Sequence, residues 1–376
     1  MRKVLTLVGT RPELIKMSRV IAELDAQTAH VLVHSGQNYD YELNQVFFDD
    51  LGIRKPDHFL DAAKDTAAKT IAEVIARTDD VLARERPEAF VLYGDTNTAL
   101  AVLAAKRRQI PVFHLEAGNR CFDDRVPEEI NRRVVDHASD INLVLSEHAR
   151  RYLIAEGIRP ETVIKTGSHM QEVLDHAMPG IAQSDVLKRL ALESGKFFVV
   201  SAHREENVDS PERLRELLAT LRAVATEWRM PVVISTHPRT RKRLEALGEN
   251  VEDAQIRFLT PLGFNDYLRL QMDCFCVLSD SGTITEEASV LNLPAVMLRD
   301  AHERPEGMDA GTLIMSGLKR DAVLDAVRVV TRHHNRERRA FPIVPDYAAG
   351  PVSKQVVRVI LSYIDYVNRT VWRRYD

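Results

Sequence analysis

The sequence predicts an α/β protein of two domains, each built on a parallel, doubly wound sheet. Short buried apolar runs alternate with stretches of helical periodicity along nearly the whole chain, as parallel sheets with crossover helices require. The second half repeats this order of elements without repeating the sequence. The length of 376 residues also favours two domains. We expect a first domain over residues 1–170, with a helix over 355–376 packing back on it, and a second domain over residues 171–354.

The elements follow one another at short intervals in both halves. Strands are expected at residues 4–8, 30–34, 89–93, 112–115, 141–145, 163–166, 197–201, 232–235, 256–259, 274–278 and 295–298. Helices are expected at residues 14–24, 43–51, 66–85, 99–108, 147–156, 214–228, 264–272, 320–332 and 355–372. A polar stretch at 179–185 separates the two series.

Composition excludes several classes of function. Hydrophobic residues make up 45% of the chain and the formal net charge is −4, which argues against broad nucleic-acid binding. Cys121, Cys274 and Cys276 form no zinc-site spacing with histidine, and their small odd number favours a reducing cytoplasm over a disulfide framework. No apolar stretch approaches the roughly 18 residues of a membrane span, and the first apolar run is too short for a signal peptide.

The turn after the first strand predicts an anion site. Thr10 and Glu13 have the spacing of a capping box at a helix start. Arg11 and Lys16 lie at or near that start, at the edge where open parallel sheets bind ligands. Cations are not favoured at a helix N-terminus, so Arg11 is either paired with an anionic ligand or simply solvated.

Carboxylates directly follow two strands of the first half. Asp95 comes after the strand at 89–93, and Glu116 comes after the strand at 112–115. Side chains at these strand ends point into the crevice where ligands bind. Glu128 and Arg132 are four residues apart on one helical face and can pair. Three converging carboxylates would supply an acid and a base, although caps and surface ion pairs would need the same residues.

The second half offers a phosphate-binding turn and a histidine. Ser281, Gly282 and a threonine follow an apolar run and open a helix, where small side chains and free backbone N–H groups suit a phosphate. Glu286 and Glu287 in the first turns would support the helix dipole or accept from ribose hydroxyls. His203 ends a strand, although a lone histidine is more often structural. An ordinary βαβ unit with a polar turn explains the same stretch without a ligand.

Seven motifs together resemble the non-hydrolysing UDP-N-acetylglucosamine 2-epimerase family. They are GTRPE (9–13), GDTNT (94–98), EAGNR (116–120), PEEINR (127–132), AHREEN (202–207), DSGTITEE (280–287) and RDAHERPE (299–306). Each motif is weak alone, but the set covers nearly the whole chain in order. The resemblance implies two Rossmann-like domains of the GT-B type, a nucleotide sugar in the inter-domain cleft, and a C-terminal helix that returns to the first domain.

The resemblance also implies the reaction and its residues. The configuration at C2 of a UDP-linked acetamido sugar would be reversed by elimination of UDP and its re-addition, without a metal or nicotinamide cofactor. Asp95, Glu116 and Glu128 match the acid/base candidates, with Arg132 and His203 beside them. The UDP-sugar-binding residues would be Arg11, Lys16, Ser281, Gly282 and Glu287. The resemblance suggests a homodimer as well. The cysteine content favours the cytoplasm, and the charge balance argues against a nucleic-acid partner.

Several motifs depart from the commonest family pattern. The loop at 35–44 reads SGQNYDYELN where most members carry a Gln-His pair, and GDTNT, EAGNRCF and DSGT replace a threonine-rich run, EAGLRT and DSGG. These segments look most similar to the branch that makes UDP-N-acetyl-L-fucosamine from UDP-2-acetamido-2,6-dideoxy-L-talose for capsule and O-antigen lipopolysaccharide biosynthesis. The alternative substrate is UDP-N-acetylglucosamine, giving UDP-N-acetylmannosamine.

Two other classes of protein remain as alternatives at this point. A GT-B glycosyltransferase would share the fold and the nucleotide turn, but it would not explain three strand-end carboxylates together with PEEINR. A non-catalytic UDP-sugar sensor would keep Arg11 and Ser281 but would not need Asp95, Glu116 and Glu128 together.

Overall fold

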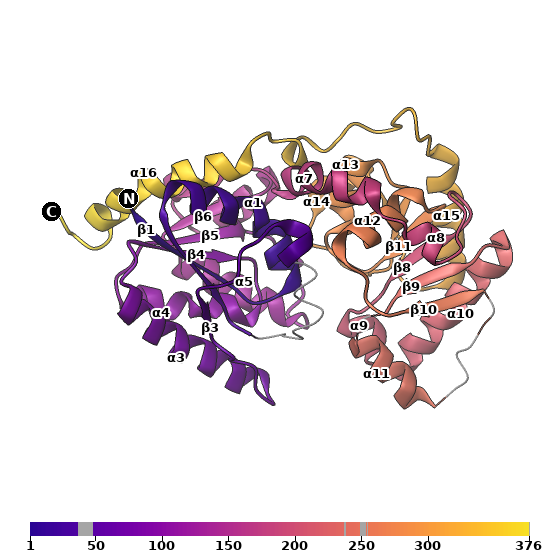
Figure 1. Ribbon diagram of the computed structural model, residues 1–376, viewed down its shortest axis with the longest axis horizontal. Helices are drawn as coiled ribbons and strands as arrows, with labels where there is room; N and C mark the ends of the chain where they lie inside the picture. The colour runs from indigo at the N-terminus through magenta and orange to yellow at the C-terminus, as the bar shows by residue number, and fades with distance from the viewer. Residues whose placement is uncertain (37–47, 237, 249–252, 254, 376) are drawn as a thin grey trace. The chain divides into compact units, whose positions relative to one another are not determined.

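The chain forms two compact units (Figure 1). The computed structural model describes residues 1–36, 48–236, 238–248, 253 and 255–375. Unit 1 contains Met1–His176 and Pro345–Asp376, and unit 2 contains Ala177–Val344. The polar loop and the start of the helix expected over 35–51 fall largely on residues 37–47, which lie outside the described residues.

Unit 1 is built on a parallel sheet with the strand order β3-β2-β1-β4-β5-β6-β7. The bounds are Lys3–Val8 (β1), Ala29–His34 (β2), His58–Phe59 (β3), Ala89–Tyr93 (β4), Val112–Ala117 (β5), Ile141–Val144 (β6) and Val163–Lys165 (β7). The central strands are buried along their length, as strands covered by helices on both faces are.

Helices cover both faces of the unit 1 sheet. They are α1 (Arg11–Gln27), α3 (Ala67–Glu85), α4 (Val102–Arg107), α5 (Pro127–Ala138), α6 (Glu147–Ala155), α7 (Met170–Gln183) and α16 (Val352–Thr370), with 3₁₀ turns at Asn97–Ala101, Pro160–Thr162 and Pro345–Tyr347. Leu5 and Leu7 of β1 share a core with Val74 and Val81 of α3 and with Val135 of α5. The C-terminal α16 lies along α1 (Figure 1).

Unit 2 is built on a second parallel sheet, in the order β10-β9-β8-β11-β12-β13. Its strands are β8 (Phe198–Ser201), β9 (Val232–Ser235), β10 (Ile256–Leu259), β11 (Cys276–Ser279), β12 (Ala295–Met297) and β13 (Ile314–Met315). Its helices are α8 (Val186–Arg189), α9 (Glu205–Val208), α10 (Pro211–Trp228), α11 (Pro238–Leu247), α12 (Phe264–Asp273), α13 (Ile284–Leu291), α14 (Pro305–Asp309) and α15 (Arg320–His333).

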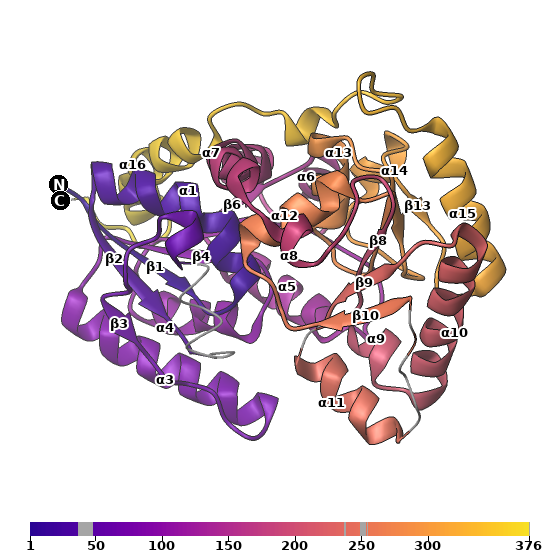
Figure 2. The ribbon, with the colours of Figure 1, turned by 45° about the vertical axis from the view of Figure 1, so that its right-hand side comes forward.

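Alternation along β8 divides the core of unit 2 between two layers of helices. Phe198 and Val200 pack with residues of α10 and α15, which lie along one side of the sheet (Figure 2). Val199 faces the other way and packs with Leu270 of α12 and Ile284 of α13. This period of two places helices on both faces, and it confirms the predicted α/β class with two doubly wound sheets.

The two sheets share one topology. Numbered from its own first strand, each sheet contains the order 3-2-1-4-5-6, which reverses between strands 1 and 4, and the unit 1 sheet adds a seventh strand after the sixth. Ligands of open parallel sheets bind outside the carboxyl ends of the strands at this reversal. In unit 1 the reversal lies between β1 and β4, and in unit 2 it lies between β8 and β11. The strand ends at these points carry most of the residues that the sequence singles out.

The structure corrects one segment and refines others. Residues 179–185, expected as a polar stretch, belong mostly to α7, which continues through Pro179 to Gln183. Its first turns are anchored by buried residues, which include Val173 and Leu174, so the missing N–H of Pro179 does not end the helix. The helix expected at 99–108 begins as a 3₁₀ turn, and the two-residue strand β3 gave too little pattern to be predicted.

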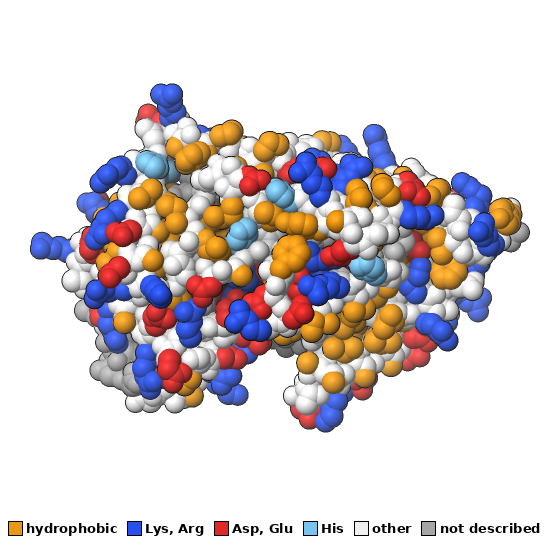
Figure 3. All heavy atoms as spheres, turned by 180° about the vertical axis from the view of Figure 1, so that it is seen from behind, with side chains coloured by type: hydrophobic (Ala, Val, Ile, Leu, Met, Phe, Trp, Pro, Cys, Tyr) orange, Lys and Arg blue, Asp and Glu red, His pale blue; other side chains and the backbone are white. Residues whose placement is uncertain are grey.

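Surface charge is mixed in sign. On the face that Figure 3 shows, basic and acidic side chains are interspersed, as a formal net charge of −4 would lead one to expect. No helix among the described residues is long and apolar enough to cross a membrane. Within the same residues, no group of histidine, cysteine and carboxylate side chains could hold a metal ion.

Candidate functional sites in the two units

The β1–α1 turn of unit 1 is held by one buried carboxylate. The backbone N–H groups of Gly9 and Thr10 donate to Glu13 Oε2, and Thr96 Oγ1 donates to Glu13 Oε1 at 2.6 Å. A Cβ on Gly9 would lie 2.1 Å from Thr98 Oγ1, so only glycine fits this close approach. The turn that carries Arg11 is therefore fixed to the end of β4 by Glu13.

Glu13 predicts a pH dependence of stability. Burial raises the pKa of its carboxyl to about 7, against the opposing effect of its three donors. Between about pH 4.5 and pH 7 the folded state then binds more protons than the unfolded state, so the free energy of unfolding falls as pH rises, by about 3 kcal/mol at most. Glu13→Gln keeps an oxygen for the two N–H groups and should abolish this decline. Urea denaturation of both proteins at about pH 5 and pH 8 gives their free energies of unfolding. An equal change in this free energy between the two pH values in wild type and variant would contradict the prediction.

Lys16 and Glu116 form a buried ion pair. Lys16 Nζ lies 2.7 Å from Glu116 Oε2, and the Tyr93 hydroxyl donates to the same oxygen at 2.7 Å. Glu116 has a φ of 62°, in the left-handed region that non-glycine residues rarely adopt, and the pairing of β5 with β6 shifts its register there. Such strain persists only where the surroundings impose it, and it is common at functional sites.

Asp95 and Arg132 form a second ion pair at the same sheet edge. Arg132 Nε donates to Asp95 Oδ2 at 2.7 Å, and Arg132 Nη1 donates to Glu129 Oε2 at 2.9 Å. Asn131 Nδ2 donates to the backbone oxygen of Asp95 at 2.9 Å, so α5 holds both the side chain and the main chain of Asp95. Glu128 lies half-buried in the first turn of α5.

Most candidates of unit 1 therefore come together on adjacent strand ends. A Cβ built on Gly94, which precedes Asp95, would lie 3.7 Å from Glu116 Oε1. Arg11 is the first residue of α1, and burial lowers the pKa of its guanidinium. Arg11 is therefore partly buried and not simply solvated.

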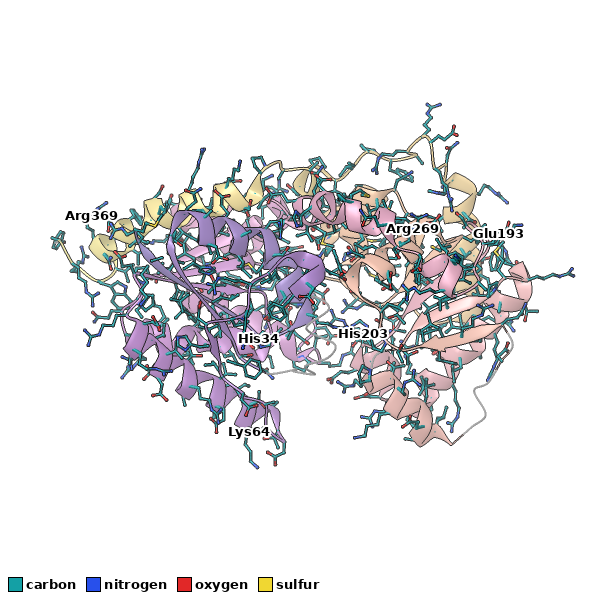
Figure 4. The ribbon with its side chains drawn as sticks, in the orientation of Figure 1. His34, Lys64, Glu193, His203, Arg269 and Arg369 are labelled. Carbon is teal, nitrogen blue, oxygen red and sulfur yellow. The ribbon has the colours of Figure 1, made fainter. Side chains whose placement is uncertain are left out.

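In unit 2, Asp280 organises the end of β8. Its buried carboxylate accepts the backbone N–H groups of His203, at 3.1 and 2.9 Å, and of Arg204 at 2.9 Å. Asn207 Nδ2 donates to Asp280 Oδ2 at 3.1 Å and to the Leu298 oxygen at 2.8 Å. The His203 ring, labelled in Figure 4, also approaches Asp280, with 3.3 Å between Nδ1 and Oδ1. One carboxylate thus fixes the ends of β8 and β11 together.

The turn before α13 is preorganised by hydroxyl groups. The helix begins at Ile284, as predicted, but two of the expected free amides are engaged. Ser281 N donates to Ser279 Oγ at 3.1 Å, and Thr283 N donates to Ser281 Oγ at 3.4 Å. Glu287 is buried and accepts from Gln271 Nε2 at 2.9 Å.

Two buried ion pairs brace the loop after β12. Arg299 donates from both terminal nitrogens to Glu303, at 2.9 and 3.0 Å. Arg304 Nη2 lies 3.1 Å from Glu286 Oε2, so Glu286 faces this loop. Sequence reasoning gave Glu286 a role only at the helix start or with ribose hydroxyls. It placed five others in motifs without a role: Arg299, Glu303, Arg304, Glu129 and Asp280. The sequence showed only that these residues are charged, because the choice of ion-pair partner depends on the tertiary fold.

Comparisons with known proteins agree on one family. Residues 22–361 match the family described as UDP-N-acetylglucosamine 2-epimerase. The chain is 58% identical to a UDP-N-acetylglucosamine 2-epimerase structure from Rickettsia bellii, which covers 100% of both chains with a TM-score of 0.94. The Methanocaldococcus jannaschii UDP-GlcNAc 2-epimerase in complex with UDP-GlcNAc and UDP is 29% identical, with a TM-score of 0.88 and coverage of 96% and 100%.

One relative is named for a different substrate. The UDP-2,3-diacetamido-2,3-dideoxy-D-glucuronate 2-epimerase of Pseudomonas aeruginosa is 35% identical over 87% of this chain and 91% of that protein. Chains that share this architecture therefore include epimerases named for more than one UDP-sugar.

Proposed function

The chain belongs to the UDP-N-acetylglucosamine 2-epimerase family, and we propose that it converts UDP-2-acetamido-2,6-dideoxy-L-talose to UDP-N-acetyl-L-fucosamine. It is a non-hydrolysing UDP-sugar 2-epimerase, an isomerase. The observation that carries the activity is the pair of ion-paired carboxylates, Asp95 and Glu116, on adjacent strand ends of unit 1. The observation that carries the sugar is the set of altered motifs, EAGNRCF above all.

The proposed reaction needs two proton-transfer groups. The C2 proton is not acidic, because no carbonyl adjoins it, so its removal must accompany departure of UDP from C1. A base takes the proton, the electron pair forms the C1–C2 double bond, and the C1–O bond breaks with its electrons on the diphosphate. Return of the proton to the opposite face and re-addition of UDP complete the epimerisation. Asp95 and Glu116 supply proton-transfer groups from different strand ends. Glu128 supplies a third from the start of α5.

The remaining candidates would stabilise the departing UDP. Positive groups are most effective where negative charge develops, and Arg11 and Lys16 of unit 1 and His203 of unit 2 are candidates for this contact. The helix start at Ser281 and Gly282 would bind the diphosphate, and Glu287 would accept from the ribose hydroxyls.

Adding a single methyl group at Gly282 tests whether the turn before α13 binds the nucleotide. A Cβ there would lie 3.8 Å from Glu303 Oε2 and 3.9 Å from an Arg204 nitrogen, which is ordinary contact, and φ of Gly282 is not in the left-handed region. Gly282→Ala should therefore change the free energy of unfolding by less than about 0.5 kcal/mol. It should weaken UDP binding by about tenfold or more, because the methyl group would occupy the path of a phosphate. Calorimetric titration with UDP measures this, and unchanged affinity would contradict the assignment.

The substrate is tested by isotope exchange. The purified enzyme is incubated in D2O with UDP-2-acetamido-2,6-dideoxy-L-talose and, separately, with UDP-N-acetylglucosamine, and proton NMR follows C2. We expect deuterium entry and a C2 epimer with the 6-deoxy sugar. Exchange with UDP-N-acetylglucosamine alone would reassign the substrate, and exchange with neither sugar despite UDP binding would refute epimerisation of both.

UDP-N-acetylglucosamine is the second candidate substrate. The observation that favours it is the 58% identity to the Rickettsia bellii structure, which is described as a UDP-N-acetylglucosamine 2-epimerase. We further propose that the enzyme acts as a cytoplasmic homodimer in capsule or lipopolysaccharide biosynthesis. Sedimentation of the purified chain tests the dimer.

A further inference from the structure

Both ring nitrogens of the buried His114 face hydrogen-bond acceptors. Nδ1 lies 2.9 Å from Asp136 Oδ1, and Nε2 lies 2.7 Å from the backbone oxygen of Gly94. A backbone carbonyl can only accept, so Nε2 must carry a proton, and a carboxylate opposite Nδ1 requires a second one. A neutral imidazole has one ring proton and cannot satisfy both.

The carboxylate of Asp136 has other donors as well. Arg120 Nη1 lies 2.7 Å from Asp136 Oδ2, and the Gly118 N–H approaches both carboxylate oxygens at 3.2 Å. These donors favour the ionised carboxylate, which places the second proton on His114. Arg120 is paired in turn with Glu156 at 2.7 Å, so two cations and two anions balance in the cluster.

We propose that His114 is a permanently protonated positioning residue that fixes the backbone after Glu116 and the backbone before Asp95. Its effect on turnover rests on the proposed function, whereas its protonation does not. The ring bonds the backbone oxygen of Gly94, which is the residue that precedes Asp95. Through Asp136 the ring holds Gly118, two residues beyond Glu116. The φ of Glu116 is 62°, a strained value that the surroundings must impose.

Charge balance around the ring supports this protonation. Burial lowers the pKa of His114, but the Asp136 carboxylate and the Gly94 carbonyl outweigh burial and raise it above its ordinary value, with a smaller contribution from Asp95. Burial likewise opposes ionisation of Asp136, yet His114 and Arg120 lower its pKa. Asp136 of α5 and the Gly94 carbonyl and Asp95 after β4 therefore all favour the protonated ring.

The first experiment uses the wild-type enzyme and needs no turnover. NMR of protein labelled with ¹⁵N-histidine is recorded at about pH 8.5, two units above the ordinary histidine pKa. We expect one ring with both nitrogens protonated, and the signal should be absent from His114→Gln. A single protonated nitrogen on His114 would overturn the proposal. If His114→Gln does not fold, Asp136→Asn assigns the signal to His114 instead, because without the Asp136 carboxylate the His114 ring should keep only one proton.

The second experiment separates positioning from mere packing. His114→Gln should lower kcat by about 10- to 100-fold with KM changed less than about threefold, and it should move the acidic limb of the pH–rate profile to higher pH. His137→Gln, an exposed position on the same helix as Asp136, is the matched control and should change neither. An unchanged pH profile would overturn the electrostatic role. Absence of turnover in wild-type enzyme would refute the proposed function and leave the NMR result standing.

Discussion

Asp95→Asn should lower kcat for C2 epimerisation by about 10³-fold, because an amide cannot accept the transferred proton. The replacement has nearly the same shape, and its oxygen can still accept from Arg132, which lies 2.7 Å from the Asp95 carboxylate. Asn131 holds the backbone oxygen of residue 95 and is unaffected by the change. We therefore expect the melting temperature and UDP affinity to stay close to wild type while deuterium exchange at C2 disappears.

The control for this variant is the same substitution on the surface. Asp65 is exposed and pairs only weakly with Lys69, so Asp65→Asn should leave exchange, binding and stability unchanged. Exchange rates come from proton NMR in D2O and UDP affinity from calorimetry. Retention of more than about a tenth of wild-type exchange by Asp95→Asn would remove Asp95 from the proton-transfer step. Loss of UDP binding together with exchange would instead assign it a role in substrate binding.

The fold was predictable because strands and helices leave local signals. Buried parallel strands are short apolar runs, and the crossover helices have a period near 3.6, so the order of elements follows from the sequence. The sites at strand ends were predictable for the same reason, since Asp95, Glu116 and His203 each follow an apolar run. Once the sheet topology is known, the pairing of β4 with β5 places the first two side by side.

The partners of these residues were not predictable. Glu128 and Glu129 have the same local signals, but successive helical residues point about 100° apart, so their side chains differ in burial. Glu129 is fully buried and accepts from Arg132 at 2.9 Å, whereas Glu128 is half-buried. Glu286 and Glu287 are both buried, but the fold gives them different partners, Arg304 and Gln271. An amphipathic pattern predicts which face of a helix is buried. At the edge of that face, the side chains of the neighbouring elements decide which of two adjacent residues is bonded.

Glu116→Gln should be as damaging as Asp95→Asn to turnover, by about 10³-fold, and it should also destabilise the protein. Lys16 and Glu116 are 4% and 13% exposed, and removing one member of such a buried pair costs about 3 kcal/mol or more. The loss of stability alone would confuse an activity assay, so denaturant unfolding must accompany the kinetics. A melting transition unchanged from wild type would contradict the burial argument.

A second variant separates the two effects. Lys16→Met with Glu116→Gln removes both charges, and replacing a buried pair by neutral side chains of similar size should restore most of the stability. Because Lys16 is also a candidate contact of the departing diphosphate, Lys16→Met alone should raise KM and lower kcat, but C2 exchange should stay measurable at saturating substrate. The double variant should be stable and yet show no exchange, which assigns the missing chemistry to Glu116. Recovery of exchange in the double variant would mean that Glu116 serves only as the counter-ion of Lys16, and that the proton is carried by another carboxylate.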